Sequence, residues 1–337
     1  MQLITHLTHL RYLIGFTGSS GFMVHNGKKA WFFTDFRYKA LAQELERKNQ
    51  GRMPFIFVEM DEKWPEKLQK ILKNSPEIKF ESAHLSVDGL KTWEKRLKGI
   101  KLSPTKTPLE ALRAQKDAEE IRSLKKSQKI NEAVLERTIK LFKTGVTELE
   151  LAWQIKAIGH ELGADDISFE PIVAFGPNSA VPHHHNSTRK LRAKDIVLID
   201  MGMQLDGYCS DMTRTFFVGK PSAEQAHIYS TVLAAQLAAE KVLKAGIPCA
   251  ELDKIARTTM GPLAEHFGHS LGHGIGLDVH ESPNLSSRSK DILTENMVVT
   301  LEPGIYLPGK FGVRIEDMGR VTPTGYENFT KFRKTMV

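Results

Sequence analysis

The sequence predicts a mixed α/β protein of two domains, the second of which is built from two similar halves. Three observations lead to this prediction. Short apolar strands alternate with amphipathic helices over residues 1–105. The stretch SPTKTP at residues 103–108, with two prolines and no periodicity, then interrupts the pattern. Beyond it, an order of two helices followed by strands occurs twice, roughly 100 residues apart.

The first domain, residues 1–105, has the pattern of a small α/β unit. The runs WFFT (31–34) and FIFV (55–58) predict buried strands. Between them, the apolar side chains of residues 38–45 fall on one helical face. A later helix is predicted to begin at Asp88, because its carboxylate can accept hydrogen bonds from the first backbone N–H groups of a helix.

A predicted linker over residues 106–116 leads to the second domain, residues 117–337. Capping boxes that begin at Thr147 and Ser222 mark the start of one helix in each half. Corresponding residues keep a similar spacing: Gly145 and Gly246 are 101 apart, Asp200 and Glu302 are 102 apart, and Asp211 and Glu316 are 105 apart. Two halves related by a pseudo-two-fold axis would each deliver two carboxylates to a shared centre.

Composition and charge exclude several classes of partner. The chain has 337 residues, 41% of them hydrophobic, and a net charge of +7. Its Lys and Arg residues are spread over predicted helices without interleaved aromatic residues, so we expect no nucleic-acid partner. No apolar run approaches the roughly 18 residues that span a bilayer, and the N-terminus lacks the features of a signal peptide. Cys209 and Cys249 form no spaced framework, which favours a reducing, cytoplasmic location.

The first indication of a metal site lies in residues 196–218. Two apolar runs, 196–199 and 213–218, flank a polar connection and predict a β-hairpin with a long loop. Antiparallel pairing would bring Asp200 and Asp211 into one small space. Two carboxylates that are close together and poorly solvated are costly unless a cation balances them.

Two further acids, Glu302 and Glu316, follow apolar strands in the second half. Any one of these acids alone could be a turn or cap residue. Their combination with a histidine from HSLGHGIGLDVHE (269–281) favours a metal site, because four carboxylates would neutralise two divalent cations. One or two of the carboxylates can bridge ions that lie about 3.5–4 Å apart. Oxygen-dominated ligation with one imidazole suits Mn(II), Co(II) or Fe(II) better than a structural zinc site does.

Four segments together resemble a known family: DMGMQLDGYCSDMTRTF, GHSLGHGIGLDVHE, LEPGIY and GVRIED. They are similar to the pita-bread dinuclear metallopeptidases, which include methionine aminopeptidase, Xaa-Pro aminopeptidase and Xaa-Pro dipeptidase (prolidase). The segments YLIGFTGSSGF and FFTDFRY also resemble the N-terminal domain of the Xaa-Pro peptidases, so the resemblance covers the whole chain. It implies a creatinase-type N-terminal α/β domain, a pita-bread catalytic domain and a homodimer.

The resemblance also implies a role for each candidate ligand. His273 would be the imidazole ligand, and Asp211 and Glu316 would bridge two metal ions. Asp200 would bind one ion only, and Glu302 would bind the other together with His273. The expected cofactor is a pair of divalent ions, with Mn(II) preferred and Co(II), Fe(II) or Zn(II) as alternatives.

The remaining catalytic residues of the family match further positions of this chain. The full set of expected catalytic residues is His183, His269, His280, Glu302, Tyr306 and Arg314. Glu302 would carry a proton from water to the leaving nitrogen. His183 and His280 would stabilise the oxyanion or hold the substrate, and Tyr306 and Arg314 would orient carboxylates that surround the metal ligands and the path of the proton.

The expected activity is that of an Xaa-Pro aminopeptidase, which removes the first residue from peptides that have proline at the second position. The alternative is an Xaa-Pro dipeptidase. Many prolidases carry an arginine shortly after the His-Glu pair, suited to the carboxylate of a dipeptide, whereas this chain has Asn284, which favours longer substrates. A more remote alternative is a non-catalytic peptide- or RNA-binding module on the same fold, against which the intact ligand set argues.

Overall fold

The computed structural model describes residues 1–105 and 109–335. The chain divides into two compact units, Met1–Glu110 and Ala111–Val337. Within the described ranges, no helix combines the length and the apolar character that a membrane crossing requires.

The N-terminal unit contains one six-stranded sheet in the order β4-β3-β2-β1-β5-β6. The strands are β1 (Gln2–Ile4), β2 (Phe22–His25), β3 (Ala30–Thr34), β4 (Ile56–Glu59), β5 (Glu77–Glu81) and β6 (Lys101–Thr105). The helices are α1 (Leu7–Ile14), α2 (Lys39–Lys48), α3 (Trp64–Leu72) and α4 (Val87–Arg96). Neighbours β1–β2 and β2–β3 run antiparallel, and the other three pairs run parallel. The predicted α/β character of this unit is confirmed.

Two predictions about this unit need correction. The strand predicted from FIFV is β4, but it is not buried: it lies at the edge of the sheet, and the Ile56 side chain is 48% exposed. An edge strand has only one neighbour, so apolar side chains there are covered less completely. The helix predicted to begin at Asp88 is capped by Ser86 instead, whose Oγ accepts a hydrogen bond from the Gly89 N–H at 3.0 Å.

The region predicted as a linker is only partly described. Residues 106–108 lie outside the described residues. On either side of them the chain is regular, because Lys101–Thr105 forms β6 and Leu109–Ala114 forms α5. Pro104, taken in the sequence as a sign of a linker, lies in an edge strand, where the missing N–H disrupts no internal ladder.

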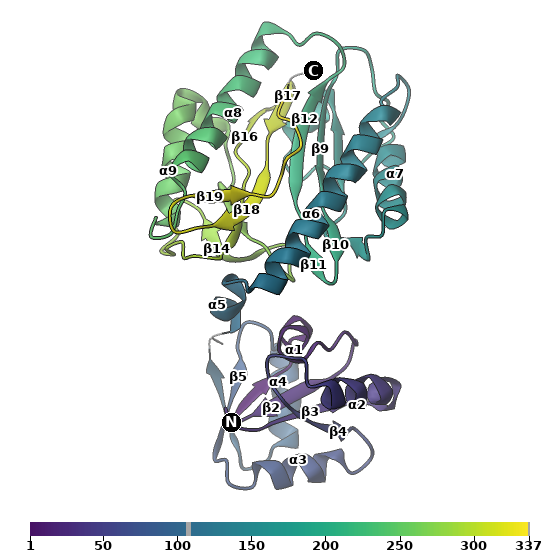
Figure 1. The fold of residues 1–337 in the computed structure, drawn as a ribbon, viewed down its shortest axis with the longest axis vertical. Coiled ribbons are helices and arrows are strands. Elements are labelled where there is room, and N and C mark those ends of the chain that lie inside the picture. Colours follow the sequence, from purple (N-terminus) through teal and green to yellow (C-terminus); the bar gives the residue numbers. More distant parts are fainter. Residues whose placement is uncertain (106–108, 336–337) are drawn as a thin grey trace. The chain divides into compact units, whose positions relative to one another are not determined.

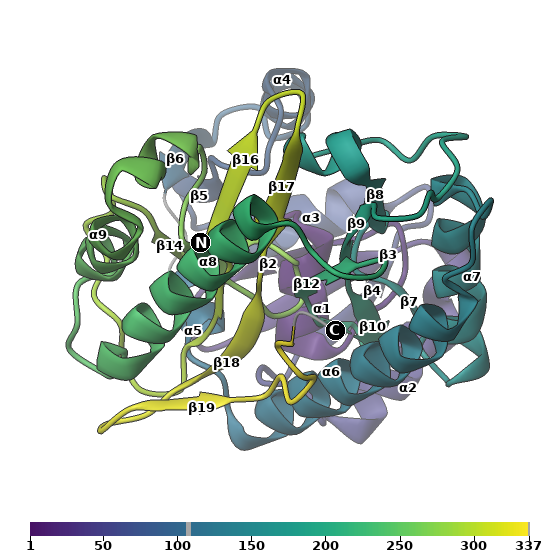
Figure 2. The same cartoon turned by 90° about the horizontal axis from the view of Figure 1, so that it is seen from above.

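The C-terminal unit places two helices on each side of a group of small sheets (Figures 1 and 2). The helices are α6 (Ala118–Thr138), α7 (Glu148–Glu161), α8 (Ala223–Val242) and α9 (Cys249–Met260). Strands of the first half are β7 (Asp166–Ile167), β8 (Ile172–Phe175), β9 (Ile196–Met201), β10 (Met203–Leu205), β11 (Tyr208–Cys209) and β12 (Met212–Phe217). Those of the second half are β13 (Gly272–Gly274), β14 (Glu281–Leu285), β15 (Val298–Leu301), β16 (Gly304–Leu307), β17 (Phe311–Arg314), β18 (Asp317–Val321) and β19 (Tyr326–Asn328).

The predicted order of two helices followed by strands occurs in both halves. The sheet β12-β9-β8 packs with α6 and α7 around one apolar core, and the sheet β14-β13-β15-β18-β19 packs with α8 and α9 around another. The capping boxes at Thr147 and Ser222 are both formed. In Figure 1 the pair α8 and α9 and the pair α6 and α7 lie on opposite sides of β9, β12, β16 and β18.

The predicted hairpin is confirmed as the antiparallel pair β9 and β12, in which Thr213 lies opposite Asp200. The connection is more ordered than the predicted long loop, since it folds into β10 and β11. The turn between them has positive φ at Asp206 (52°) and Gly207 (80°). An Asp-Gly pair with that geometry forms a tight two-residue hairpin turn.

Candidate metal centre

The four predicted acids meet where strands of the two halves end. Asp200 lies in β9 opposite Thr213 of β12, and Asp211 directly precedes β12. Glu302 lies between β15 and β16, and Glu316 lies between β17 and β18. The backbone N–H of Glu316 donates to the Thr213 carbonyl at 3.0 Å, which ties the second half to the first at this point.

His273 is directed at the acids. Its Nε2 lies 3.7 Å from Asp211 Oδ2 and 3.5 Å from Glu302 Oε1. Potential ligand atoms of Asp211, His273 and Glu316 all lie within 4.8 Å of one another. His273 Nδ1 lies 3.1 Å from the carbonyl oxygen of Gly274, and because a carbonyl can only accept, Nδ1 carries the proton. The lone pair on Nε2 is therefore free to bind a metal ion.

The electrostatics of the centre call for a cation. Burial is the largest cause that raises the pKa values of Asp211, Glu302 and Glu316, and the charges of neighbouring carboxylates raise them further. Within the described part of the chain, the buried atoms Asp200 Oδ1 and Asp211 Oδ1 have no hydrogen-bond partner. Crowded, desolvated carboxylates with unused lone pairs are stable when they are bound to a cation. Four carboxylates and one imidazole fit a pair of divalent ions.

A chain of hydrogen bonds holds Asp200 in place. The Arg314 side chain, 3% exposed, donates to Asp200 Oδ2 at 2.6 Å and to the Tyr306 hydroxyl at 2.6 Å. The Tyr306 hydroxyl lies 2.8 Å from His269 Nε2, and His269 Nδ1 lies 2.9 Å from the Ser270 carbonyl. Burial, followed by the charge of Arg314, lowers the pKa of His269 to about 3. His269 is therefore neutral, and its Nε2 accepts a hydrogen bond from the Tyr306 hydroxyl. Each donor in this series of hydrogen bonds thus has an acceptor.

Two predicted histidines lie at the edge of the centre. The His280 ring packs edge-on against His273 at a centroid distance of 4.4 Å, and burial lowers its pKa. His183 is exposed and directly follows Pro182, whose carbonyl accepts a hydrogen bond from Arg314 Nη1 at 3.4 Å. All ten predicted site residues are thus brought together around the four acids. The neighbouring His184 has a different environment, since its Nε2 contacts the buried carboxylate of Glu148 at 2.8 Å.

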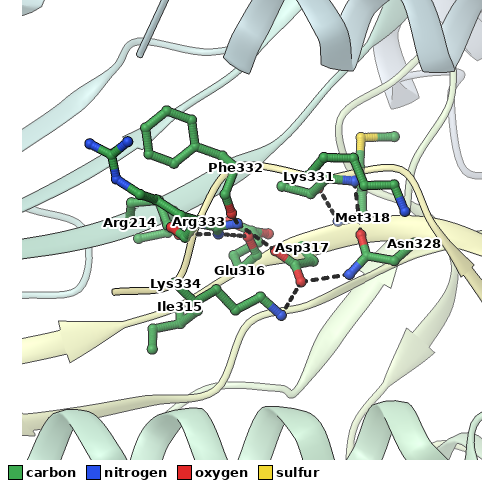
Figure 3. Close-up of polar contacts among 12 residues, drawn as sticks. Arg214, Ile315, Glu316, Asp317, Met318, Asn328, Lys331, Phe332, Arg333 and Lys334 are labelled. Carbon is green, nitrogen blue, oxygen red and sulfur yellow. Dashed lines mark hydrogen bonds and ion pairs between the residues drawn. The ribbon is translucent and has the colours of Figure 1, made fainter. Parts of the chain in front are cut away.

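The sequence did not predict the residues that support Glu316 from behind (Figure 3). Arg214, which follows Thr213 in β12 and is 1% exposed, donates to the Glu316 carbonyl at 2.6 Å and to Asp317 Oδ1 at 2.8 Å. It also donates to the Phe332 carbonyl at 2.8 Å, which attaches the C-terminal segment to the strands that carry the acids. The available signal was an arginine inside an apolar strand, a residue that is rarely buried without a partner.

Thr213 links the two networks. Its hydroxyl donates to Glu316 Oε2 at 2.8 Å and accepts from Arg314 Nε at 3.0 Å. The orientation of the Glu316 carboxylate is therefore fixed by the same residue that faces Asp200 across the hairpin.

Comparisons with known proteins identify the family of this chain. Residues 122–323 match metallopeptidase family M24, and residues 1–115 match the creatinase/prolidase N-terminal domain. The chain is 36% identical over 343 residues to an uncharacterized peptidase of Bacillus subtilis, YqhT, a match that covers 100% of this chain and 95% of that protein.

Solved structures are similar along the full chain. The Xaa-Pro dipeptidase from Bacillus anthracis matches with a TM-score of 0.94 and 36% identity, covering 100% of this chain and 94% of that one. The X-Pro aminopeptidase from Thermotoga maritima matches with a TM-score of 0.90 and 33% identity (99% and 96% covered), and the prolidase from Pyrococcus furiosus with 0.90 and 32% (98% and 96% covered). By its sequence, its fold and the converging acids, the chain belongs to metallopeptidase family M24 and carries a creatinase/prolidase N-terminal domain.

Proposed function

We propose that the protein is an Xaa-Pro dipeptidase, which hydrolyses the bond between a first residue and a C-terminal proline. The sequence alone favoured the related aminopeptidase and kept the dipeptidase as the alternative. The observation that reverses this preference is the full-length likeness to an Xaa-Pro dipeptidase and to a prolidase. The aminopeptidase is the second candidate, because an X-Pro aminopeptidase is similar at 33% identity and because Asn284 stands where an arginine would suit a dipeptide carboxylate.

In this proposal, five residues hold two divalent ions, with Mn(II) as the preferred metal: Asp200, Asp211, His273, Glu302 and Glu316. The close approach of their oxygen and nitrogen atoms and the unpartnered oxygens of the two aspartates support this assignment. When bound, such a pair of ions supplies Lewis acidity and lowers the pKa of a water molecule towards neutrality.

The chain's own residues move the proton and hold the substrate. Glu302 takes a proton from the attacking water and delivers it to the proline nitrogen as the peptide bond breaks. That nitrogen carries no proton in the peptide, so it needs one to leave as an amine. His280 and His183, at the edge of the centre, donate to the carbonyl oxygen as it gains negative charge. Arg314 and Tyr306 keep Asp200 and His269 in fixed orientations while this occurs.

The decisive experiment compares a matched dipeptide and tripeptide, Ala-Pro and Ala-Pro-Ala, with purified protein that has been loaded with Mn(II). The proposal expects kcat/KM to be at least about 10-fold higher for Ala-Pro, a difference of about 1.4 kcal/mol in transition-state binding. A Glu316→Gln variant prepared in parallel controls for contaminating peptidases. The opposite preference would assign the aminopeptidase. Failure to bind divalent ions or to cleave either peptide would favour the non-catalytic binding module.

Asn284 offers a second test of substrate length. It lies in β14 directly opposite His273 in β13, and it is exposed. An arginine at this position can pair with the C-terminal carboxylate of a dipeptide. We expect Asn284→Arg to raise the ratio of Ala-Pro to Ala-Pro-Ala cleavage, with Asn284→Gln as the control of similar polarity. An unchanged ratio would mean that the dipeptide carboxylate is bound elsewhere.

A further inference from the structure

A second group of potential metal ligands lies in the N-terminal unit, outside the metal centre. One ring nitrogen from each of His6, His9 and His84 lies within 4.8 Å of the other two. His6 directly precedes α1 and His9 lies in its first turn, and residues three apart at a helix start face the same side. His84 comes from the turn that follows β5.

The three rings pack tightly together. His6 and His84 are stacked, with ring centroids 3.8 Å apart and an angle of 14° between the planes. The His9 ring stands edge-on to both, at centroid distances of 4.8 Å and 5.0 Å. Three imidazoles from two separate parts of the chain therefore share one small volume.

His9 has the environment of a metal-binding histidine. It is fully buried, and its Nδ1 contacts the carboxylate of Glu81, which is 1% exposed. The backbone N–H groups of Thr5 (2.7 Å) and His6 (3.1 Å) also donate to that carboxylate. A carboxylate that takes up two backbone N–H groups acts as an acceptor, so Nδ1 of His9 is the donor in this contact.

The other ring nitrogen of His9 is not satisfied by the protein. His9 Nε2 is buried and has no hydrogen-bond partner anywhere in residues 1–105 and 109–335. A buried polar atom without a partner is unfavourable, so its presence needs an explanation. A carboxylate on one ring nitrogen and a metal ion on the other is the common arrangement of a ligating histidine.

His84 repeats part of this arrangement and provides access. Its Nε2 lies 3.1 Å from Glu110 Oε1, so a carboxylate orients this ring as well. The side chain of His84 is 23% exposed, and it comes from a surface turn. A metal ion can therefore reach the cluster from solvent.

We propose that His6, His9 and His84 bind one divalent transition-metal ion, with Zn(II) as the preferred cation. Three neutral imidazoles with no carboxylate among the ligands suit Zn(II), Ni(II) or Cu(II), whereas Mn(II) prefers oxygen ligands. Zn–N bonds of about 2.0–2.1 Å place ligand nitrogens of a tetrahedral site roughly 3.3 Å apart. The candidate ligand nitrogens lie within 4.8 Å of one another before any ion is bound. The fourth position is open to water.

The test uses the full-length protein and compares metal content between variants. Wild type, His84→Ala and His227→Ala are stripped with a chelator, loaded with Zn(II), desalted and analysed for metal ions per chain by mass spectrometry. His227 is an exposed histidine on α8 and serves as the control. We expect His84→Ala to hold one equivalent less than wild type, and His227→Ala to equal wild type. This difference does not depend on how many ions the metal centre retains.

Co(II) gives an independent readout. The difference spectrum between Co(II)-loaded wild type and His84→Ala should contain the visible bands of a four-coordinate, nitrogen-rich site. His9→Gln should remove the same bands, and circular dichroism checks that this buried substitution leaves the fold intact. Equal Zn(II) content in wild type and His84→Ala, together with a flat Co(II) difference spectrum, would overturn the proposal.

Discussion

Replacing Arg214 with methionine tests whether the contacts behind Glu316 maintain the metal centre. The Arg214 guanidinium donates to Asp317 Oδ1 and to the carbonyls of Glu316 and Phe332 in a fully buried setting (Figure 3). Methionine keeps the apolar stem of the side chain and removes every one of these donors. Breaking a buried ion pair by removing one partner costs about 3–5 kcal/mol. Because Lys334 still contacts the Asp317 carboxylate, we expect the lower end of this range, about 3 kcal/mol.

The assay is thermal unfolding of the metal-free protein, with Arg137→Met as the matched control. Arg137 pairs with Glu161 at 2.6 Å, but the two side chains are 44% and 59% exposed, so the loss of this pair should cost less than about 1 kcal/mol. A loss of 3 kcal/mol lowers the Tm of a unit of this size by roughly 6–12 °C. The reasoning is refuted if Arg214→Met and Arg137→Met shift the Tm by the same small amount.

Arg214→Met should also affect the centre itself. Its contact with the Glu316 carbonyl positions the backbone of a proposed ligand. Losing such a supporting contact typically weakens metal affinity by about 10–100-fold. Metal content after dialysis against a weak chelator would measure this, and an unchanged affinity would confine the role of Arg214 to stability.

Further predictions concern other buried groups. Asp211→Asn should lose bound metal and peptidase activity together, whereas His280→Ala should keep its metal and lose about 10²-fold or more in turnover; loss of metal in the His280 variant would contradict its proposed role. Cys209 and Cys249 should not react with a thiol reagent in the folded protein at pH 8, since burial raises both thiol pKa values, that of Cys249 to about 12; two thiols should react after denaturation. Burial acts to raise the pKa of Glu148, but hydrogen bonds lower it below its ordinary value. The ionised group therefore stabilises the fold at neutral pH, and this contribution is lost as the pH falls through the acidic range. Glu148→Gln should make the free energy of unfolding, measured with urea, less dependent on pH in that range.

The acids of the site could be predicted from the sequence, because burying a charged group without a partner is energetically unfavourable. Asp200 lies near the end of the apolar strand β9 and Asp211 directly precedes β12, and an acid in such a position needs a partner. Their approach follows from the antiparallel pairing of two apolar runs that are close together in the sequence, which is a local feature. The capping boxes at Thr147 and Ser222 were predictable for the same reason, because each depends on residues within one turn.

The parts that could not be predicted depend on contacts between distant residues. Arg214 meets the Phe332 carbonyl across more than 100 residues, and no local pattern indicates which carbonyl a buried arginine will find. The position of β4 at the sheet edge is likewise a property of the assembled sheet. Ser86 and Asp88 are both good cap residues, and the choice between them is made by where the chain leaves the turn after β5.

The two proposed metal sites differ in charge, and this difference bears on how metal dependence should be measured. At the metal centre, four carboxylates face one buried guanidinium, that of Arg314, so a strong negative charge selects hard divalent ions. In the N-terminal unit, the rings of His6, His9 and His84 are the ligands, and the carboxylates contact them only from behind. Borderline-soft ions such as Zn(II) are favoured there. Activity plotted against total added metal would then combine two binding events. The His84→Ala variant changes no ligand of the metal centre, so it separates the ion needed for hydrolysis from the ion held by the histidines.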